Sequence, residues 1–194
     1  MDSELIQSLS KYVDLSKELI SAIEESTMIR RYKKGTILLK EGHYCNECYF
    51  ILKGCIRAYC LKDGEEITTE FYTEDQVVLL SIYGKQIESS ITLECSEDTI
   101  VSFGTPEFEK VMYQKYPILV TFNSAMAEIL MAQYQDTHTE FKLTSPEERY
   151  LNLIKTRPDL IQRVPLHQIA SYLGMKPETL SRIRRRIVTR KNES

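Results

Sequence analysis

The chain has no tryptophan and is poor in glycine, proline and histidine, with 7, 6 and 3 of these among 194 residues. This composition excludes collagen-like and Pro/Gly-rich disordered proteins. No apolar run approaches the roughly 20 residues that a membrane-spanning helix needs, and runs such as Val77–Leu80 are typical. The acidic, amphipathic N-terminus also lacks the basic segment and apolar core of a secretory signal. We therefore expect a soluble globular protein located in the cytoplasm.

Cysteine is present in an odd number, five, without the spacing of a disulfide framework, which favours reduced thiols. Cys45 and Cys48 have the Cys-x₂-Cys spacing that occurs in zinc and redox sites. However, Cys48, Cys55 and Cys60 fall on expected strands, where successive side chains alternate between faces and do not converge on one ion. We expect no bound metal and no cofactor; a redox-sensitive thiol at Cys45 or Cys48 remains an open alternative.

Catalytic constellations are also absent from the sequence. The three histidines, His43, His138 and His167, are scattered, and no His-x-His pair occurs. A metal enzyme built on a β-roll would need such a pair together with a Glu and a third His. No Ser–His–Asp or Cys–His arrangement can be assembled either, so we expect that the protein is not an enzyme.

Charge is distributed unevenly along the chain. Residues 1–143 contain 14 Lys and Arg against 23 Asp and Glu, whereas residues 144–194 contain 11 against 5. The net charge of −3 therefore combines an acidic body with a basic C-terminal segment. This asymmetry is typical of a nucleic-acid-binding module at the C-terminus, although a solvated basic helix would give the same count.

The pattern of apolar residues predicts two short helices in residues 3–29 and short β-strands from Met28 to Gly104. The β-rich runs have five to eight residues and are separated by regularly spaced glycines, which favours an antiparallel sandwich or roll. Asp63-Gly64 is the clearest hairpin signal, because a tight turn of the primed type needs positive φ, which Gly and Asp tolerate.

After Gly104 the sequence again predicts helices. Thr105 can cap a short helix that runs to Tyr113, and Pro117 opens a long helix. Ser145-Pro146-Glu147-Glu148 is a capping box with proline at the first helical position. The apolar stripe of the long helix can pair with a second copy of the chain or pack on the helix's own roll, and it contains Ile118, Leu119, Phe122, Ala125, Met126, Ile129 and Leu130.

These elements predict an α+β fold in three parts. Residues 1–116 form an antiparallel, jelly-roll-like β-roll sensor domain with N-terminal helices, and residues 117–143 form a dimerisation helix. Residues 144–194 form a small helix-turn-helix domain with, at most, a minimal wing.

Two helices joined by a glycine turn are predicted in Leu166–Ile183. Gly174 supplies the left-handed residue of the turn, and Ala170 is the small residue at which the helices cross. Pro177 starts the second helix. The inner faces carry Ile169, Leu173, Leu180 and Ile183.

In the second helix, residues 177–187, Leu180 and Ile183 are expected to face inward, and this sets the rotation of the helix about its axis. At 100° per residue the opposite face carries Glu178, Arg182 and Arg185. Arg can bind guanine O6 and N7 in a major groove, and Glu can accept from cytosine N4. The residues expected to contact phosphates are Lys176, Ser181, Arg184, Arg186 and Arg190.

The sequence resembles the Crp/Fnr family of bacterial transcription regulators over nearly its whole length. KKGTILLKEG, YFILKGCIRAY and DGEE are similar to that family's β-roll, and IASYLGMKPETLSRIRRRI is similar to its helix-turn-helix. The resemblance implies a homodimer that reads a pseudo-palindromic double-stranded DNA site, with Glu178 and Arg182 as base readers and RNA polymerase as a partner. Pro177 replaces the family's common basic residue before that Glu, so one contact of the family is missing.

In the nucleotide-binding members of that family, a Gly-Glu-Leu turn and an Arg hold the cyclic nucleotide. Neither occurs in residues 75–92, where Glu88 or Ser89 stands in place of the Arg, and we expect no binding of cyclic AMP. A different small-molecule effector remains open. Its candidate pocket residues are Phe71, Tyr72, Leu80, Tyr83, Ser89 and Ser90.

The alternative function is a small-molecule- or redox-sensing roll whose basic tail binds a protein or RNA. A basic surface located elsewhere than on the second helix would favour this alternative.

Overall fold

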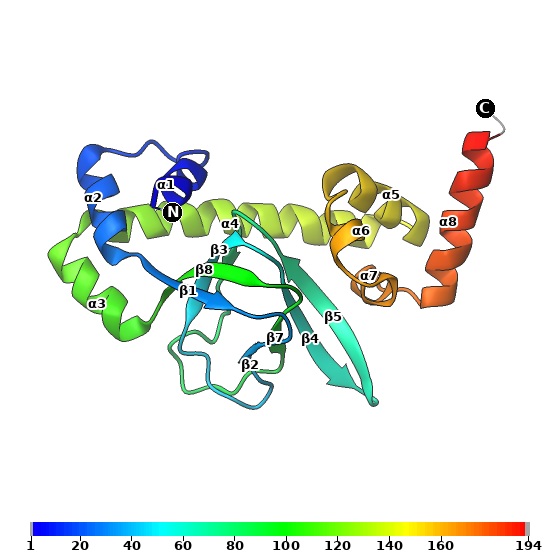
Figure 1. The fold of residues 1–194 in the computed structure, drawn as a ribbon, viewed down its shortest axis with the longest axis horizontal. Coiled ribbons are helices and arrows are strands. Elements are labelled where there is room, and N and C mark those ends of the chain that lie inside the picture. Colours follow the sequence, from blue (N-terminus) through cyan, green and yellow to red (C-terminus); the bar gives the residue numbers. More distant parts are fainter. Residues whose placement is uncertain (1, 193–194) are drawn as a thin grey trace. The chain divides into compact units, whose positions relative to one another are not determined.

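A computed structural model describes residues 2–192 of the chain (Figure 1). Two helices, α1 (Asp2–Leu9) and α2 (Lys17–Ser26), precede the strands, as the sequence predicts. The Ser16 side chain caps α2 by accepting a hydrogen bond from the backbone N–H of Leu19 at 3.1 Å. The local capping chemistry therefore fixes the start of α2.

Eight strands form two four-stranded sheets with the orders β1-β8-β3-β6 and β2-β7-β4-β5. In the first sheet all recorded pairings are antiparallel, for example Phe50 opposite Ser102. The strands are β1 (Met28–Tyr32), β2 (Ile37–Leu39), β3 (Cys48–Lys53), β4 (Ile56–Lys62), β5 (Glu65–Tyr72), β6 (Val77–Val78), β7 (Thr92–Cys95) and β8 (Thr99–Gly104). The antiparallel roll predicted from the glycine spacing is confirmed.

The turn between β4 and β5 has the backbone geometry expected from its sequence. Asp63 and Gly64 both have positive φ, 53° and 82°. Two consecutive residues with positive φ are typical of the tight turn that matches the twist of a hairpin. The prediction of a hairpin at Asp63-Gly64 is therefore confirmed.

The first sheet is covered on both faces. Tyr49 and Ile51 of β3 face the core inside the roll, together with Val78 and Val101. The alternate residue Phe50 faces a second core, made with α1, α2 and the helices that follow the roll. Because side chains of a strand alternate between faces, one strand lines both cores.

Helix α3 (Pro106–Lys115) follows β8, and α4 (Ile118–Leu143) is the longest helix. Thr105 caps α3 by accepting from the N–H of Phe108 at 3.3 Å. The apolar stripe predicted on α4 packs on its own domain, since Leu119 and Met126 are buried in the second core with Ile118 and Phe122 beside them. Of the two alternatives for that stripe, the structure favours packing on the roll side.

The remaining helices are α5 (Pro146–Thr156), α6 (Leu160–Arg163), α7 (Leu166–Tyr172) and α8 (Pro177–Asn192). The capping box at the start of α5 is confirmed, because Ser145 Oγ accepts from Glu148 N–H and Glu148 Oε2 accepts from Ser145 N–H. Between residues 144 and 192 the structure contains helices but no strand. The expected minimal wing therefore has no β-structure here.

Contacts divide the chain into two compact units. The first contains the residues up to Ala58 together with Phe71–Gln135, and the second contains Tyr59–Glu70 together with the residues from Asp136 onward. The outer part of the β4–β5 hairpin thus groups with the C-terminal helices, and the three-part domain division from the sequence stays a prediction. Within the described residues, no helix has the length and apolar character needed to cross a membrane.

Candidate nucleic-acid interface

The turn between α7 and α8 closes by two backbone hydrogen bonds. Met175 N–H donates to Ala170 O at 2.9 Å, and Gly174 N–H donates to Ser171 O at 3.0 Å. Gly174 has a φ of +67°. This pair of bonds around a left-handed glycine is the Schellman ending of a helix. Gly174 therefore has the left-handed conformation that the sequence predicts.

Gly174 is also crowded by side chains of the same unit. A Cβ placed there would lie 3.1 Å from Arg149 Nη1 and 3.2 Å from Phe141 Cζ. The Arg149 guanidinium lies over the Phe141 ring at 4.2 Å and donates to Leu173 O at 2.6 Å. The turn is therefore held from outside by α5, a contact that the sequence did not indicate.

The two helices pack through the residues predicted for their inner faces. Ile169, Ala170 and Leu180 are fully buried, and Leu173 and Ile183 are 5% exposed. Burying these apolar side chains contributes about 1.5–3 kcal/mol each for the larger ones. This burial fixes the rotation of α8 about its own axis, and so decides which of its side chains face outward.

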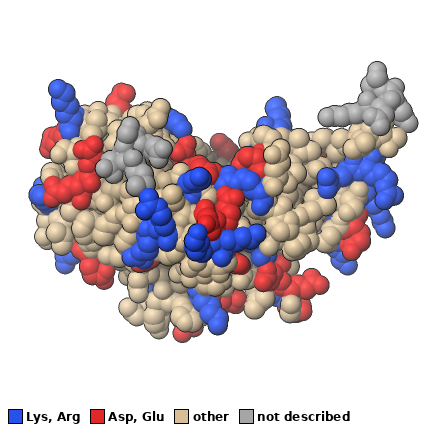
Figure 2. Space-filling model, in the orientation of Figure 1, with Lys and Arg blue, Asp and Glu red and all other residues tan. Residues whose placement is uncertain are grey.

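The opposite face of α8 carries the predicted base-reading residues. Glu178, Arg182 and Arg185 are all exposed. Figure 2 shows Lys and Arg side chains gathered over the C-terminal helix. Lys176, Ser181 and Arg184 are exposed as well. Within the part of the chain that the structure describes, no ion pair involves Arg182, Arg184 or Arg185, so these three charges are available to an anionic partner.

Two of the residues predicted to contact phosphates form ion pairs within the protein. Arg186 and Arg190 form ion pairs with the two carboxylate oxygens of Glu147, at 2.7 and 2.9 Å. Glu147 lies in the first turn of α5. Because the three residues are exposed or half-exposed, this network is accessible to water and salt and can open. The pairing connects distant parts of the sequence, and no local signal predicted it.

The hairpin segment Tyr59–Glu70 supports α7. Thr68 N–H donates to Ser171 Oγ at 2.9 Å, and Ser171 Oγ in turn contacts Glu66 O at 3.4 Å. Arg157 forms an ion pair with Glu70 at 3.6 Å. Burial, followed by the charge of Glu70, raises the pKa of Tyr172 to about 12. A hairpin from the roll sequence therefore braces the first helix of the two-helix unit.

The effector residues proposed from the sequence differ in burial, and their role in binding a molecule stays a prediction. Phe71 and Ser89 are buried, and the Ser89 hydroxyl donates to Ile91 O while accepting from Ile91 N–H. Tyr72, Leu80 and Tyr83 pack against the roll core, whereas Ser90 is exposed. Ser89, which stands where the resemblance expects an Arg, is thus used to hold its own loop.

Three of the thiols, those of Cys45, Cys48 and Cys95, have a raised pKa. Burial raises the pKa of Cys45, and burial followed by the nearby Glu109 charge raises that of Cys48 to about 11. Burial also raises the pKa of Cys95 to about 11. No cluster of three or more potential ligands that could hold a metal occurs among the residues described. A nucleophilic thiolate needs a lowered pKa, so Cys48 is poorly suited to that role.

Comparison with known proteins gives one match to a family model and several solved structures with a similar fold. Residues 29–114 match the family model of the cyclic nucleotide-binding domain. No curated protein sequence matches the chain. The fold is similar to that of the c-di-GMP-responsive global regulator CLP from Xanthomonas campestris, with a TM-score of 0.68 at 15% identity, covering 89% of this chain and 91% of that one.

Two further solved structures are similar. FixK2 from Bradyrhizobium japonicum has a TM-score of 0.63 at 20% identity, covering 85% of this chain and 86% of its own. The catabolite activator protein of Thermus thermophilus has a TM-score of 0.55 at 18% identity, covering 95% and 88%. Residues 29–114 of the chain are therefore similar to the cyclic nucleotide-binding domain, and the fold is similar to that of CLP, FixK2 and the catabolite activator protein.

Proposed function

We propose that the protein is a sequence-specific, DNA-binding transcription regulator of Crp/Fnr type. The observation that carries this proposal is the outer face of α8, where Glu178, Arg182 and Arg185 are exposed opposite the buried Leu180 and Ile183. The α7–turn–α8 unit is then a helix-turn-helix whose second helix enters a major groove.

In that groove, the exposed side chains have distinct tasks. Arg182 and Arg185 donate to guanine, and Glu178 accepts from cytosine, each contact contributing about 1–3 kcal/mol of discrimination. Lys176 and Arg184 pair with phosphates. Lys176 lies at the amino end of α8, where the positive end of the helix dipole also favours an anion.

The protein acts as a homodimer through α4. A second stripe of this helix, distinct from the one that packs on the roll side, is exposed at every position. Its members recur at alternating intervals of four and three residues, the spacing of a coiled-coil seam. They are Val120, Ser124, Ala127, Met131, Tyr134, His138 and Phe141. Phe141 also supports the turn through Arg149.

The regulator responds to a molecule other than cyclic AMP and recruits or blocks RNA polymerase at its promoters. The use of Ser89 to bind its own loop and the lack of an Arg between Arg57 and Arg149 support the first part. Titration of the protein with cyclic AMP tests it, and micromolar binding would overturn it.

Selection of bound DNA from a random pool tests the proposed function directly. We expect a two-fold symmetric site with half-sites one helical turn apart, about 34 Å. Arg182→Ala should then lose discrimination at one base pair per half-site, whereas Lys155→Ala, an exposed charge on α5, should not. Enrichment of no sequence, or equal discrimination in Arg182→Ala, would contradict the proposal and favour an RNA or protein partner.

A further inference from the structure

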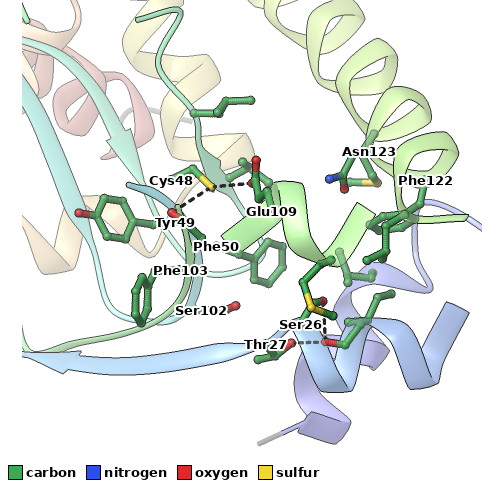
Figure 3. Close-up of a pocket in the computed structure, with 18 of the residues that line it drawn as sticks. Ser26, Thr27, Cys48, Tyr49, Phe50, Ser102, Phe103, Glu109, Phe122 and Asn123 are labelled. Atoms are coloured by element: carbon green, nitrogen blue, oxygen red, sulfur yellow. Dashed lines mark hydrogen bonds between the residues drawn. The ribbon is translucent and has the colours of Figure 1, made fainter. Parts of the chain in front are cut away.

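A cavity of about 400 Å³ lies outside the β-roll, between the first sheet and the helices of the first unit. It is lined by α1, α2, β3, β6, β8, α3 and the N-terminal half of α4 (Figure 3). Most of its wall is apolar, and the larger side chains include Phe50, Phe103, Phe108, Met112, Phe122 and Met126. The size is within the range of small-molecule sites.

The cavity contains a single charged group. Among its lining residues, Glu109 is the only acidic or basic side chain. Figure 3 shows Glu109 beside Cys48, with Asn123 on the adjoining wall. Glu109 lies in the first turn of α3, where the helix dipole stabilises a negative charge. The cavity therefore has a fixed anionic point in an otherwise apolar wall.

In the part of the chain that the structure describes, Glu109 has only uncharged partners. Its carboxylate accepts from the Cys48 thiol, a weak donor, at 3.5 Å, and it also interacts with the hydroxyls of Tyr83 and Tyr113. A carboxylate can accept about four hydrogen bonds, so Glu109 can still accept from a bound molecule. The buried Tyr83 hydroxyl makes no hydrogen bond of good geometry with the described residues, and burial, followed by the nearby Cys48, raises its pKa.

We propose that this cavity binds a small hydrophobic molecule that carries an amine, with its ammonium group on Glu109 and its apolar body among the aromatic side chains. An ammonium group supplies the charge and the donors that Glu109 lacks. Ammonium groups also interact favourably with aromatic faces such as that of the nearby Phe108. Asn123, whose Nδ2 donates to Tyr113 Oη at 2.6 Å, keeps its carbonyl oxygen available for a second donor.

The same wall disfavours anions. Among the described residues, no Lys, Arg or His lines the cavity, so a carboxylate or phosphate would lose its hydration without gaining a partner and would be repelled by Glu109. The site therefore differs in charge preference from a cyclic nucleotide pocket, which must hold a phosphate. This proposal does not depend on DNA binding, because occupancy can be measured on the protein alone.

Calorimetric titration with three matched probes tests the site: 4-phenylbutylamine, 4-phenylbutanol and 4-phenylbutyrate. We expect the amine to bind about tenfold more tightly than the alcohol, the usual advantage of a charge-assisted hydrogen bond, and the carboxylate to bind most weakly. Glu109→Gln should remove the preference for the amine and leave the binding of the alcohol unchanged.

Two further variants control the experiment. Glu107→Gln changes an exposed carboxylate in the same helical turn and should leave all three affinities unchanged. Ser102→Phe fills the cavity from β8 and should reduce binding of the amine and the alcohol at least tenfold, in a protein whose circular dichroism stays that of the native chain. Equal binding of the amine and the carboxylate, no binding of any probe at millimolar concentration, or full binding by Ser102→Phe would overturn the proposal.

Discussion

Arg149 Nη1 donates a hydrogen bond of 2.6 Å to the backbone carbonyl of Leu173, and so joins the first turn of α5 to the turn between α7 and α8. The same guanidinium donates through Nε to Thr144 O at 3.3 Å and stacks on Phe141. One side chain thus satisfies two carbonyl groups at helix ends that would otherwise be left without a partner.

Arg149→Met should lower the free energy of unfolding of the C-terminal unit by about 2–3 kcal/mol. The substitution keeps an apolar stem against Phe141 but leaves the Leu173 carbonyl without its charged donor. Urea denaturation followed by circular dichroism measures the change, with Lys155→Met as the control at an exposed position of α5. An unchanged midpoint for Arg149→Met would show that the contact does not stabilise the turn.

Gly174→Ala should destabilise the protein more than Gly64→Ala. Both glycines have positive φ, which costs an L-residue about 1 kcal/mol. A Cβ at Gly64 has nothing within 4 Å, whereas one at Gly174 meets Arg149 and Phe141 closer than ordinary contact. We expect a loss of about 1 kcal/mol at Gly64 and about 2 kcal/mol at Gly174, measured by urea denaturation. Equal losses would mean that Arg149 and Phe141 move aside without cost.

The features that the sequence predicted correctly depend on interactions between residues that are close together in the sequence. The capping box at Ser145 and the hairpin turn at Asp63-Gly64 need only four consecutive residues or fewer, and the glycine turn at Gly174 needs six. Their hydrogen bonds are made within the same short segment. Residue type and spacing therefore suffice to indicate them.

The features that the sequence missed depend on residues far apart in the chain. Glu147 meets Arg186 and Arg190 across about forty positions, and Ser171 meets Thr68 across about a hundred. The cavity around Glu109 is likewise lined by residues from seven helices and strands. On α4 the sequence indicated one apolar stripe, because the second, exposed stripe that we propose as the dimer seam contains Ser124, Ala127 and His138 and is not continuously apolar.

Glu147→Gln should increase the affinity for DNA irrespective of its sequence. The carboxylate now pairs with Arg186 and Arg190, at 2.7 and 2.9 Å, and its removal makes the Arg186 guanidinium group available to a phosphate. Each additional phosphate contact makes the dependence of log K on log salt steeper by about 0.9. Affinities at several salt concentrations measure the slope, with Glu107→Gln in the roll unit as the control. A slope identical to that of the unsubstituted protein would mean that Arg186 does not reach the DNA.

The stability of the fold should fall between about pH 9 and pH 11 because of the buried thiols. The pKa values of Cys48 and Cys95 are raised from 9.0 to about 11 in the folded protein. Below pH 9 both thiols are protonated in the folded and in the unfolded protein, so their contribution to stability is fully present. As the pH rises from 9 through 11, the thiols ionise first in the unfolded chain, and this ionisation lowers the stability of the folded protein. The double variant Cys48→Ala, Cys95→Ala should lose less stability over this interval in urea denaturation. Parallel pH profiles would indicate that the two thiols ionise alike in both states.

Met131→Glu combined with Tyr134→Glu should convert the protein to a monomer. The two side chains are 65% and 71% exposed in the single chain, although both are large and apolar. In a coiled coil they would occupy adjacent seam positions, where four like charges would face one another across the dimer axis. Because neither residue packs on its own domain, the variant should keep the thermal stability of the isolated fold.

Sedimentation equilibrium distinguishes the two stripes of α4. Ala132→Glu places a charge on an exposed position one residue beyond Met131, off the seam, and should leave the dimer intact. A monomeric regulator would contact one half-site only and lose most of its affinity for a two-fold symmetric operator, whereas its affinity for a single half-site should be unchanged. If the double variant stayed dimeric, the exposed stripe would not be the seam, and the dimer axis would have to be sought on another surface of the chain.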